Sequence, residues 1–184
     1  MRELRWVSEE YDGMEHLAFD ARAEGVVVES VLTGQRDGRA YGLCYRIECD
    51  AQWRVTRAFL RVMGGASLEL HGDGTGHWRD GNGLALAHIE GCIDIDIAAT
   101  PFTNTLPIRR LQLTQGERRV LRMAYIAVPD LRVTRMRQAY TCIAPDREYR
   151  YENVDSDFAA SLEVDEDGLV IDYPALFRRL PIAR

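Results

Sequence analysis

The chain contains no lysine: all 23 basic residues are arginine, set against 29 acidic residues, and the formal net charge is −6. An acidic total argues against a large phosphate-binding surface, so we expect no nucleic-acid partner. No run of about 18 apolar residues occurs, so no transmembrane segment is expected. The first ten residues also lack the apolar stretch of a secretory signal, so we expect a cytoplasmic protein.

The sequence is also poor in chemical motifs. Its four cysteines form no Cys-x-x-Cys pair or other zinc spacing, which predicts reduced thiols that pack as small hydrophobic side chains. Neither a Gly-x-Ser-x-Gly elbow nor a phosphate-binding glycine loop is present. The sequence therefore predicts no metal site, no cofactor and no catalytic residue that a motif would identify.

The length and composition are those of one ordinary globular domain. The chain has 184 residues, of which 46% are hydrophobic and 28% charged, and we predict a single domain over residues 1–184. Turn signals recur at the short spacing typical of all-β proteins, and many segments between them alternate. The clearest half-buried strand is 41–49, where one face carries Tyr41, Leu43, Tyr45, Ile47 and Cys49.

Further segments extend this pattern to the whole chain. Residues 14–22 and 25–33 predict an antiparallel pair, and 158–164 with 168–173 predict a closing hairpin. The segments 53–63 and 118–128 are apolar on both faces and must be covered on both. We predict an all-β fold in which a single curved antiparallel sheet of about a dozen strands forms an open or half barrel. Residues 174–180 predict a short C-terminal helix.

The most informative stretch is the central block, residues 91–111. It reads Gly-Cys-Ile-Asp-Ile-Asp-Ile-Ala-Ala-Thr-Pro-Phe-Thr-Asn-Thr-Leu-Pro-Ile-Arg-Arg-Leu. Strict alternation in its first half places Asp94 and Asp96 on one face of a strand and the isoleucines on the other. These carboxylates must face water, a polar cavity or a partner, because an unpaired buried charge is costly. Pro101 and Pro107 predict a shaped loop after the strand.

The two carboxylates have three open interpretations. At about 3.3 Å rise per residue they lie roughly 6–7 Å apart, which borders on the separation of an inverting glycosidase pair. They could instead bond an arginine or backbone donors, or contact a polar ligand. His71, His77 and His88 are close in sequence, but no compact metal motif accompanies them, so we predict surface or hairpin histidines.

Arginine is concentrated in residues 105–150, where ten arginines face four acids. The planar guanidinium suits phosphate or carboxylate head groups. The alternative is that these arginines lie on exposed strand faces and pair with acids from other strands.

The central block resembles the signature of the bacterial putative glycolipid-binding family. The resemblance continues through Trp53, the turn 80–83 after Trp78, the segment 128–131 and the segment 168–174, and so covers essentially the whole chain. It implies a curved antiparallel sheet similar to those of lipoprotein-localisation carriers and mycobacterial lipid-carrier lipoproteins. It also implies that the protein binds a glycolipid or a related ligand.

The resemblance and the two-sided apolar strands together predict a non-enzymatic protein that holds a hydrophobic or amphiphilic small molecule in an apolar cavity of the sheet. A concave face filled by the protein's own side chains, with no cavity, would count heavily against this prediction. Candidate cavity walls are Tyr45, Trp53, Phe59, Met63, Leu121, Met123 and Tyr125. The predicted ligand-binding residues are Tyr45, Trp53, Trp78, Asp94, Asp96, Asn104, Arg109 and Arg110.

Two other functions remain open. One is a hydrolase of a sugar or lipid head group that uses Asp94 and Asp96 with His77 or His88, which requires these groups to converge in one pocket. The other is an assembly module whose open sheet edge pairs with a second copy to form a homodimer.

Overall fold

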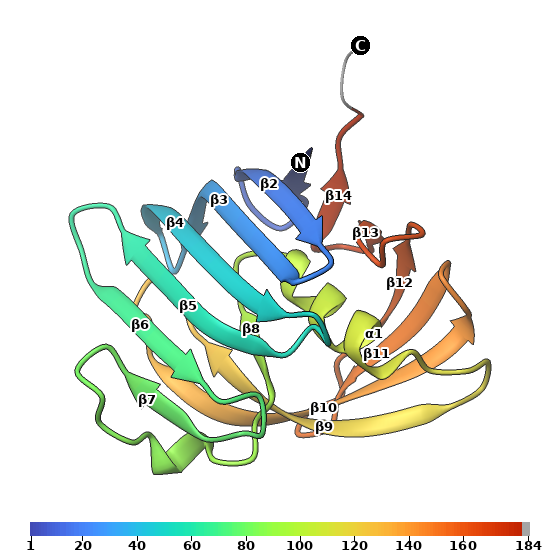
Figure 1. Ribbon diagram of the computed structural model, residues 1–184. Coiled ribbons are helices and arrows are strands. Elements are labelled where there is room, and N and C mark those ends of the chain that lie inside the picture. Colours follow the sequence, from blue (N-terminus) through green and yellow to red (C-terminus); the bar gives the residue numbers. More distant parts are fainter. Residues whose placement is uncertain (182–184) are drawn as a thin grey trace.

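The computed structural model describes residues 1–181 and consists of one curved sheet wrapped around a short helix (Figure 1). The sheet has 14 strands in the order β7-β6-β5-β4-β3-β2-β1-β14-β13-β12-β11-β10-β9-β8. Its first half is an antiparallel meander in which each strand pairs with the next along the chain. These strands are β1 (Arg2–Ser8), β2 (Met14–Arg22), β3 (Gly25–Arg36), β4 (Arg39–Asp50), β5 (Val55–Val62), β6 (Ser67–Gly72) and β7 (Trp78–Asp80).

The second half is another antiparallel meander, and its last strand pairs with β1 to join the two halves. Its strands are β9 (Arg118–Ile126), β10 (Val133–Ala144), β11 (Glu148–Asn153), β12 (Ala159–Val164), β13 (Val170–Tyr173) and β14 (Phe177–Arg179). The edge strands are short: β7 has 3 residues, and β8 (Asp94–Ile97) at the other end has 4. Such short edges offer little backbone for pairing with a second chain.

The central block connects the two meanders. β8 pairs in parallel with β9, and a parallel pair needs a long crossover. Here the crossover contains the 3₁₀ turn η2 (Phe102–Asn104) and the helix α1 (Thr105–Leu111); a second 3₁₀ turn, η1 (Ala87–Ile89), precedes β8. Figure 1 shows α1 lying between the two halves of the sheet.

The predicted fold class is confirmed: the protein is mostly β, with one curved sheet that remains open. Two local predictions are wrong. Residues 174–180 form no helix, because residues 177–179 pair with β1 and β13 as β14, and Ala175 has a left-handed φ of 65°. Residues 101–107 are helical and not a loop, because Pro101 precedes η2 and Pro107 falls in the first turn of α1, where its missing N–H costs nothing.

The concave side of the sheet is filled by the central block. Ile95, Ile97, Phe102 and Leu106 join the large core built on strands β1–β6, and each is at most 1% exposed. Ile108 joins a second core with β10–β13, which includes Tyr140, Tyr149, Tyr151, Leu162, Val164, Val170 and Tyr173. The side chains of β8, η2 and α1 therefore fill the place of the apolar cavity that the sequence led us to expect.

The predicted cavity walls divide accordingly. Tyr45 and Met123 are buried in the packed interior. Phe59 lies opposite Arg46 and Glu69 on the outer, charged face, and Met63 is 81% exposed, so neither can line a cavity. A β-bulge in the pairing of β4 with β5 explains why the simple alternation failed: Glu48 lies opposite Arg57, but Cys49 lies opposite Val55. Val55 therefore points inward while Phe59 points outward.

Many exposed arginines pair with acids from other strands or turns. In the basic segment, Arg118 pairs with Glu152 and Arg137 with Asp155. This arrangement agrees with the alternative of charged, exposed strand faces, where each pair contributes little to stability. None of the helices within residues 1–181 is long and apolar enough to cross a membrane.

Candidate functional site

An open pocket lies where the end of β8 and the loop after it face β9–β11 and the β13–β14 turn. Its volume is about 190 Å³. One side carries polar groups from the central block, and the other carries aromatic rings from the second meander. The pocket is lined by Asp96, Ile97, Ala98, Thr100, Asn104, Tyr125, Met136, Tyr151, Asn153, Phe158, Tyr173, Leu176 and Phe177.

The polar side is centred on Asp96. Its Oδ1 accepts a hydrogen bond from the Thr103 hydroxyl at 3.1 Å, and its Oδ2 accepts one from the Gln138 amide at 2.6 Å. The Thr103 hydroxyl accepts the Ile97 N–H, so it is the donor toward Asp96. Burial raises the pKa of Asp96, and the bonds from Gln138 and Thr103 oppose part of that rise.

A hydrogen-bond network continues behind the pocket. The Tyr140 hydroxyl donates to Asn104 Oδ1 at 2.9 Å, and the Asn104 amide donates to the Pro101 carbonyl at 3.1 Å. Gln138 and Tyr140 are buried, as is Asn104. This network fixes the side chain of Asn104, while Gln138 and Thr103 fix that of Asp96.

The aromatic side is a connected cluster. Tyr151 lies 5.9 Å from Phe158 and 6.1 Å from Tyr173, and Tyr173 lies 6.3 Å from Phe177, measured between ring centroids. Burial raises the pKa values of Tyr151 and Tyr173, so these phenols stay neutral at physiological pH. The rings therefore offer apolar faces, and their hydroxyls offer neutral hydrogen-bonding groups.

A second buried carboxylate lies on the other side of the same loop. Glu15 of β2 accepts hydrogen bonds from Ser30 and Thr100, each at 2.6 Å, and from the hydroxyl of Tyr45. A hollow of about 20 Å³ beside it has room for about one water molecule. Glu15 therefore connects the loop at Thr100 to strands β2–β4 by hydrogen bonds, and Tyr45 provides one of them.

Replacing Glu15 with glutamine should raise stability relative to the wild type at alkaline pH, with an advantage that shrinks in acid. Burial raises the pKa of Glu15 although Ser30, Thr100 and Tyr45 oppose the rise. A raised pKa in the folded state stabilises the protein below the unfolded-state pKa, and this contribution is lost as pH rises through the folded-state value. Urea unfolding at about pH 4, 6 and 8 measures the difference.

The control for this prediction is Ser30→Ala, which keeps the Glu15 carboxylate but removes one of its donors. It should steepen the loss of stability with rising pH, opposite to Glu15→Gln. A difference between Glu15→Gln and the wild type that stays constant with pH would contradict the prediction.

Asp94 forms a separate ion pair and does not line the pocket. Arg110 of α1 donates from Nε to both carboxylate oxygens, at 3.0 and 3.2 Å, and again from Nη2. The Asp94 side chain is 1% exposed and that of Arg110 is 14% exposed. This pair holds α1 against β8.

Arg109, the next residue, points to another part of the protein. Its guanidinium lies 5.6 Å from the centre of the Trp53 ring, and its Nη1 donates to the Glu166 carbonyl at 3.1 Å. Gly168, with φ of 72°, packs so closely on Arg109 that a Cβ would lie 2.9 Å from its Cδ. Arg109 thus joins α1 to the turn between β12 and β13.

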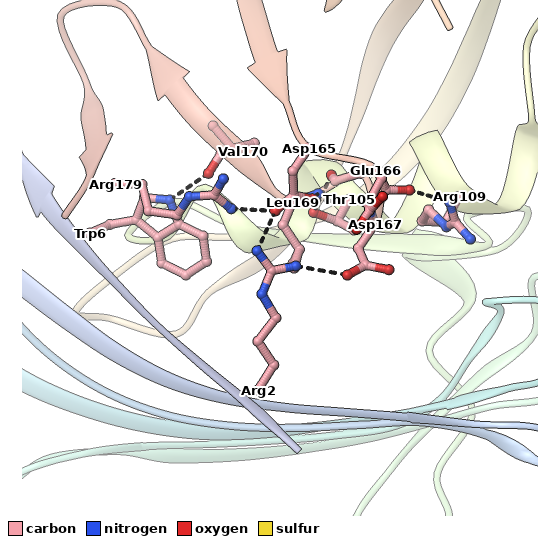
Figure 2. Close-up of polar contacts among 11 residues, drawn as sticks. Arg2, Trp6, Thr105, Arg109, Asp165, Glu166, Asp167, Leu169, Val170 and Arg179 are labelled. Atoms are coloured by element: carbon pink, nitrogen blue, oxygen red, sulfur yellow. Dashed lines mark hydrogen bonds and ion pairs between the residues drawn. The ribbon is translucent and has the colours of Figure 1, made fainter. Parts of the chain in front are cut away.

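That turn is held from three elements (Figure 2). The Asp165 carboxylate accepts from Arg2 of β1 at 2.8 Å and from Arg179 of β14 at 2.6 Å. The Thr105 hydroxyl of α1 donates to the Gly168 carbonyl at 2.9 Å. The arginine-rich end of the central block therefore stabilises the join between the two meanders.

The sequence profile described as "Putative glycolipid-binding" matches residues 3–179. The chain belongs to this family. A crystal structure of a DUF1089 family protein from Pseudomonas aeruginosa is similar, with 46% identity and a TM-score of 0.82 over 90% of this chain and 92% of that chain. A comparison with curated proteins found no match.

In this member of the putative glycolipid-binding family, the eight predicted ligand-binding residues do not form one site. Asp96 and Asn104 line the pocket together. Trp78 is buried and donates to the Cys92 carbonyl at 2.6 Å, which anchors the start of the central block. The other five are Tyr45, Trp53, Asp94, Arg109 and Arg110, whose contacts are those given above.

The groups required by the hydrolase alternative do not converge. Asp94 forms an ion pair with Arg110 and does not line the pocket. Of the two carboxylates, Asp96 lines it. His77 pairs with Asp73 at 2.8 Å in the β6–β7 turn, and His88 is exposed in η1. The geometry therefore does not support hydrolysis by this set of residues.

Sequence reasoning missed most of the residues around Asp96. Gln138, Thr103 and Tyr140 carry no motif, and their position depends on how β10 and the crossover pack. The alternation of Tyr149 and Tyr151 with charged residues was the one visible signal, since it marks an aromatic strand face. The rings of Phe158, Tyr173 and Phe177 join this face only through sheet pairing.

Proposed function

We propose that the protein binds an amphiphile whose polar head group enters the Asp96 pocket. The observation that carries this proposal is the composition of the pocket: the Asp96 carboxylate and Asn104 line one side, and a cluster of aromatic rings lines the other. Few convergent polar groups beside apolar walls are typical of small-molecule sites. The family description, glycolipid binding, agrees with a head group of this kind.

The size of the pocket limits what enters it. Its volume of about 190 Å³ is below the roughly 300–1,000 Å³ of sites that enclose a drug-sized ligand. The interior beneath it is packed by Ile97 and Phe102. The head group therefore enters, while the apolar chain lies outside over the rim, where Phe158 is 42% exposed and Leu176 is half-buried.

Native mass spectrometry of the protein purified from its own cells, followed by lipid extraction, tests the proposal. We expect an amphiphile at a stoichiometry near one per chain. The variant Ala98→Phe places a ring in the pocket lining without removing a polar group, and should raise the dissociation constant by about tenfold, equivalent to about 1.4 kcal/mol. Ala87→Phe, on the exposed η1 turn, is the matched control and should leave binding unchanged.

Two results would count against the proposal. One is a wild-type protein that carries no amphiphile and takes up none from a cell lipid extract. The other is equal retention by Ala98→Phe and the wild type when both unfold at the same temperature, since that would locate the ligand elsewhere.

A further inference from the structure

The Asp96 carboxylate has no cationic partner among the described residues. Its hydrogen-bond donors, Thr103 and Gln138, are neutral, whereas the neighbouring Asp94 is paired with Arg110. Both Asp96 oxygens accept hydrogen bonds, and burial raises the pKa of this carboxyl, so a cation in the pocket is what would favour its ionised form. Each oxygen has a second lone pair, so the carboxylate can accept a further hydrogen bond from the pocket.

The ring cluster opposite Asp96 is suited to a cation. Tyr125, Tyr151, Phe158, Tyr173 and Phe177 all line the pocket. An aromatic face attracts a cation within about 6 Å of its centroid, and groups of such rings recognise quaternary ammonium ligands. A pocket that was only apolar would gain nothing from a buried carboxylate, which costs free energy unless it is compensated.

The other charges near the pocket do not supply the missing cation. Arg36 interacts with the hydroxyl of Tyr125 but does not line the pocket. In the turn after β11, Asp155 is paired with Arg137. Asp157, which precedes Phe158, is exposed and has no ion pair within residues 1–181. None of these charged residues therefore supplies a cation to Asp96.

We propose that the Asp96 pocket recognises a positively charged ammonium group, held between the Asp96 carboxylate and the rings of Tyr151, Phe158 and Tyr173. This inference rests on the proposed function and names the chemistry of the head group: an amine or quaternary ammonium, as in an amino sugar or a choline-like group. The carboxylate provides the opposite charge, and the rings replace the water that the cation loses.

The test compares choline with 3,3-dimethyl-1-butanol, which has the same shape but no charge, by NMR titration of the full chain. We expect choline to bind at least about tenfold more tightly, equivalent to about 1.4 kcal/mol. Asp96→Asn keeps the shape of the side chain and should remove that preference. Phe158→Leu keeps an apolar side chain but removes the ring. It should weaken choline binding by about two- to fivefold and leave the affinity for the alcohol unchanged.

The control is Asp155→Asn, which changes the net charge equally but lies outside the pocket lining, and should leave the preference intact. Equal affinities for choline and the alcohol in the wild type, or an undiminished preference in Asp96→Asn, would overturn the inference. Dodecyltrimethylammonium, used below its micelle concentration, distinguishes a lipid head group from a free amine. If it binds more tightly than choline, the natural ligand is an amphiphile. Saturable binding of neutral alkyl glycosides with no binding of choline would overturn the inference but leave the proposed function standing, whereas no binding of any probe would remove both.

Discussion

Replacing Arg110 with methionine should lower the free energy of unfolding at neutral pH by about 3–5 kcal/mol, the usual cost of removing one partner from a buried ion pair. Asp94, at 1% exposure, would keep its charge inside the protein with nothing to balance it. Burial already raises the pKa of Asp94, and Arg110 is what opposes that rise. Urea unfolding of the variant and the wild type measures the loss.

The pH dependence distinguishes a lost ion pair from lost packing. Without Arg110 the pKa of Asp94 rises further, so the variant should regain stability as the pH falls and Asp94 takes up a proton. Adding Asp94→Asn to the methionine variant should recover stability at neutral pH, because no buried charge remains. A loss that is the same at all pH values, and that the second substitution does not relieve, would mean that Arg110 acts through packing alone.

The strands were the predictable part of this fold. Hydrophobic alternation placed the pairs at 14–22 and 25–33 and the strand 41–49 within a few residues of β2, β3 and β4. Alternation reports which faces are buried, and in an antiparallel meander consecutive strands pair, so the sequence and the sheet order agree. The curved, open sheet followed from the same pattern together with the family resemblance.

The central block was harder to interpret because its structure depends on what surrounds it. Two prolines predicted a loop, but the sheet wraps around this segment and favours compact helical turns, with Pro107 where a helix tolerates it. The strands that are apolar on both faces did need a second cover. We interpreted that cover as a ligand cavity, whereas in the structure α1 itself provides it. Local pattern shows that a surface must be covered and does not show by what.

Only part of the candidate site could be predicted, because local pattern shows which face a side chain lies on but not its partners. Alternation showed correctly that Asp94 and Asp96 share a face and need polar surroundings. Their partners differ, because Arg110 forms an ion pair with Asp94, whereas the neutral Gln138 donates a hydrogen bond to Asp96. These partners lie 16 and 42 residues away in sequence, and no spacing rule links them to the carboxylates. The aromatic rings opposite Asp96 likewise come together only through the order of the strands.

Replacing Phe102 with alanine should destabilise the protein by about 3–5 kcal/mol, the range for deleting a fully buried aromatic side chain. Phe102 is 0% exposed and lies in the core that the central block forms with β1–β6. Chemical denaturation measures the loss, and Phe158→Ala is the matched control. Phe158 is 42% exposed on the rim of the pocket, so its removal should cost no more than about 1 kcal/mol.

The size of the Phe102 effect decides between two views of the interior. If the concave side is a packed core, its atoms interdigitate at crystal-like density and the deletion leaves an apolar cavity at full cost. If instead Phe102 were a loose plug over a site that opens for an acyl chain, alanine would cost little and would increase the uptake of long-chain lipids. A large loss of stability without increased uptake therefore assigns the interior to folding, and leaves the Asp96 pocket on the surface as the place where a ligand binds.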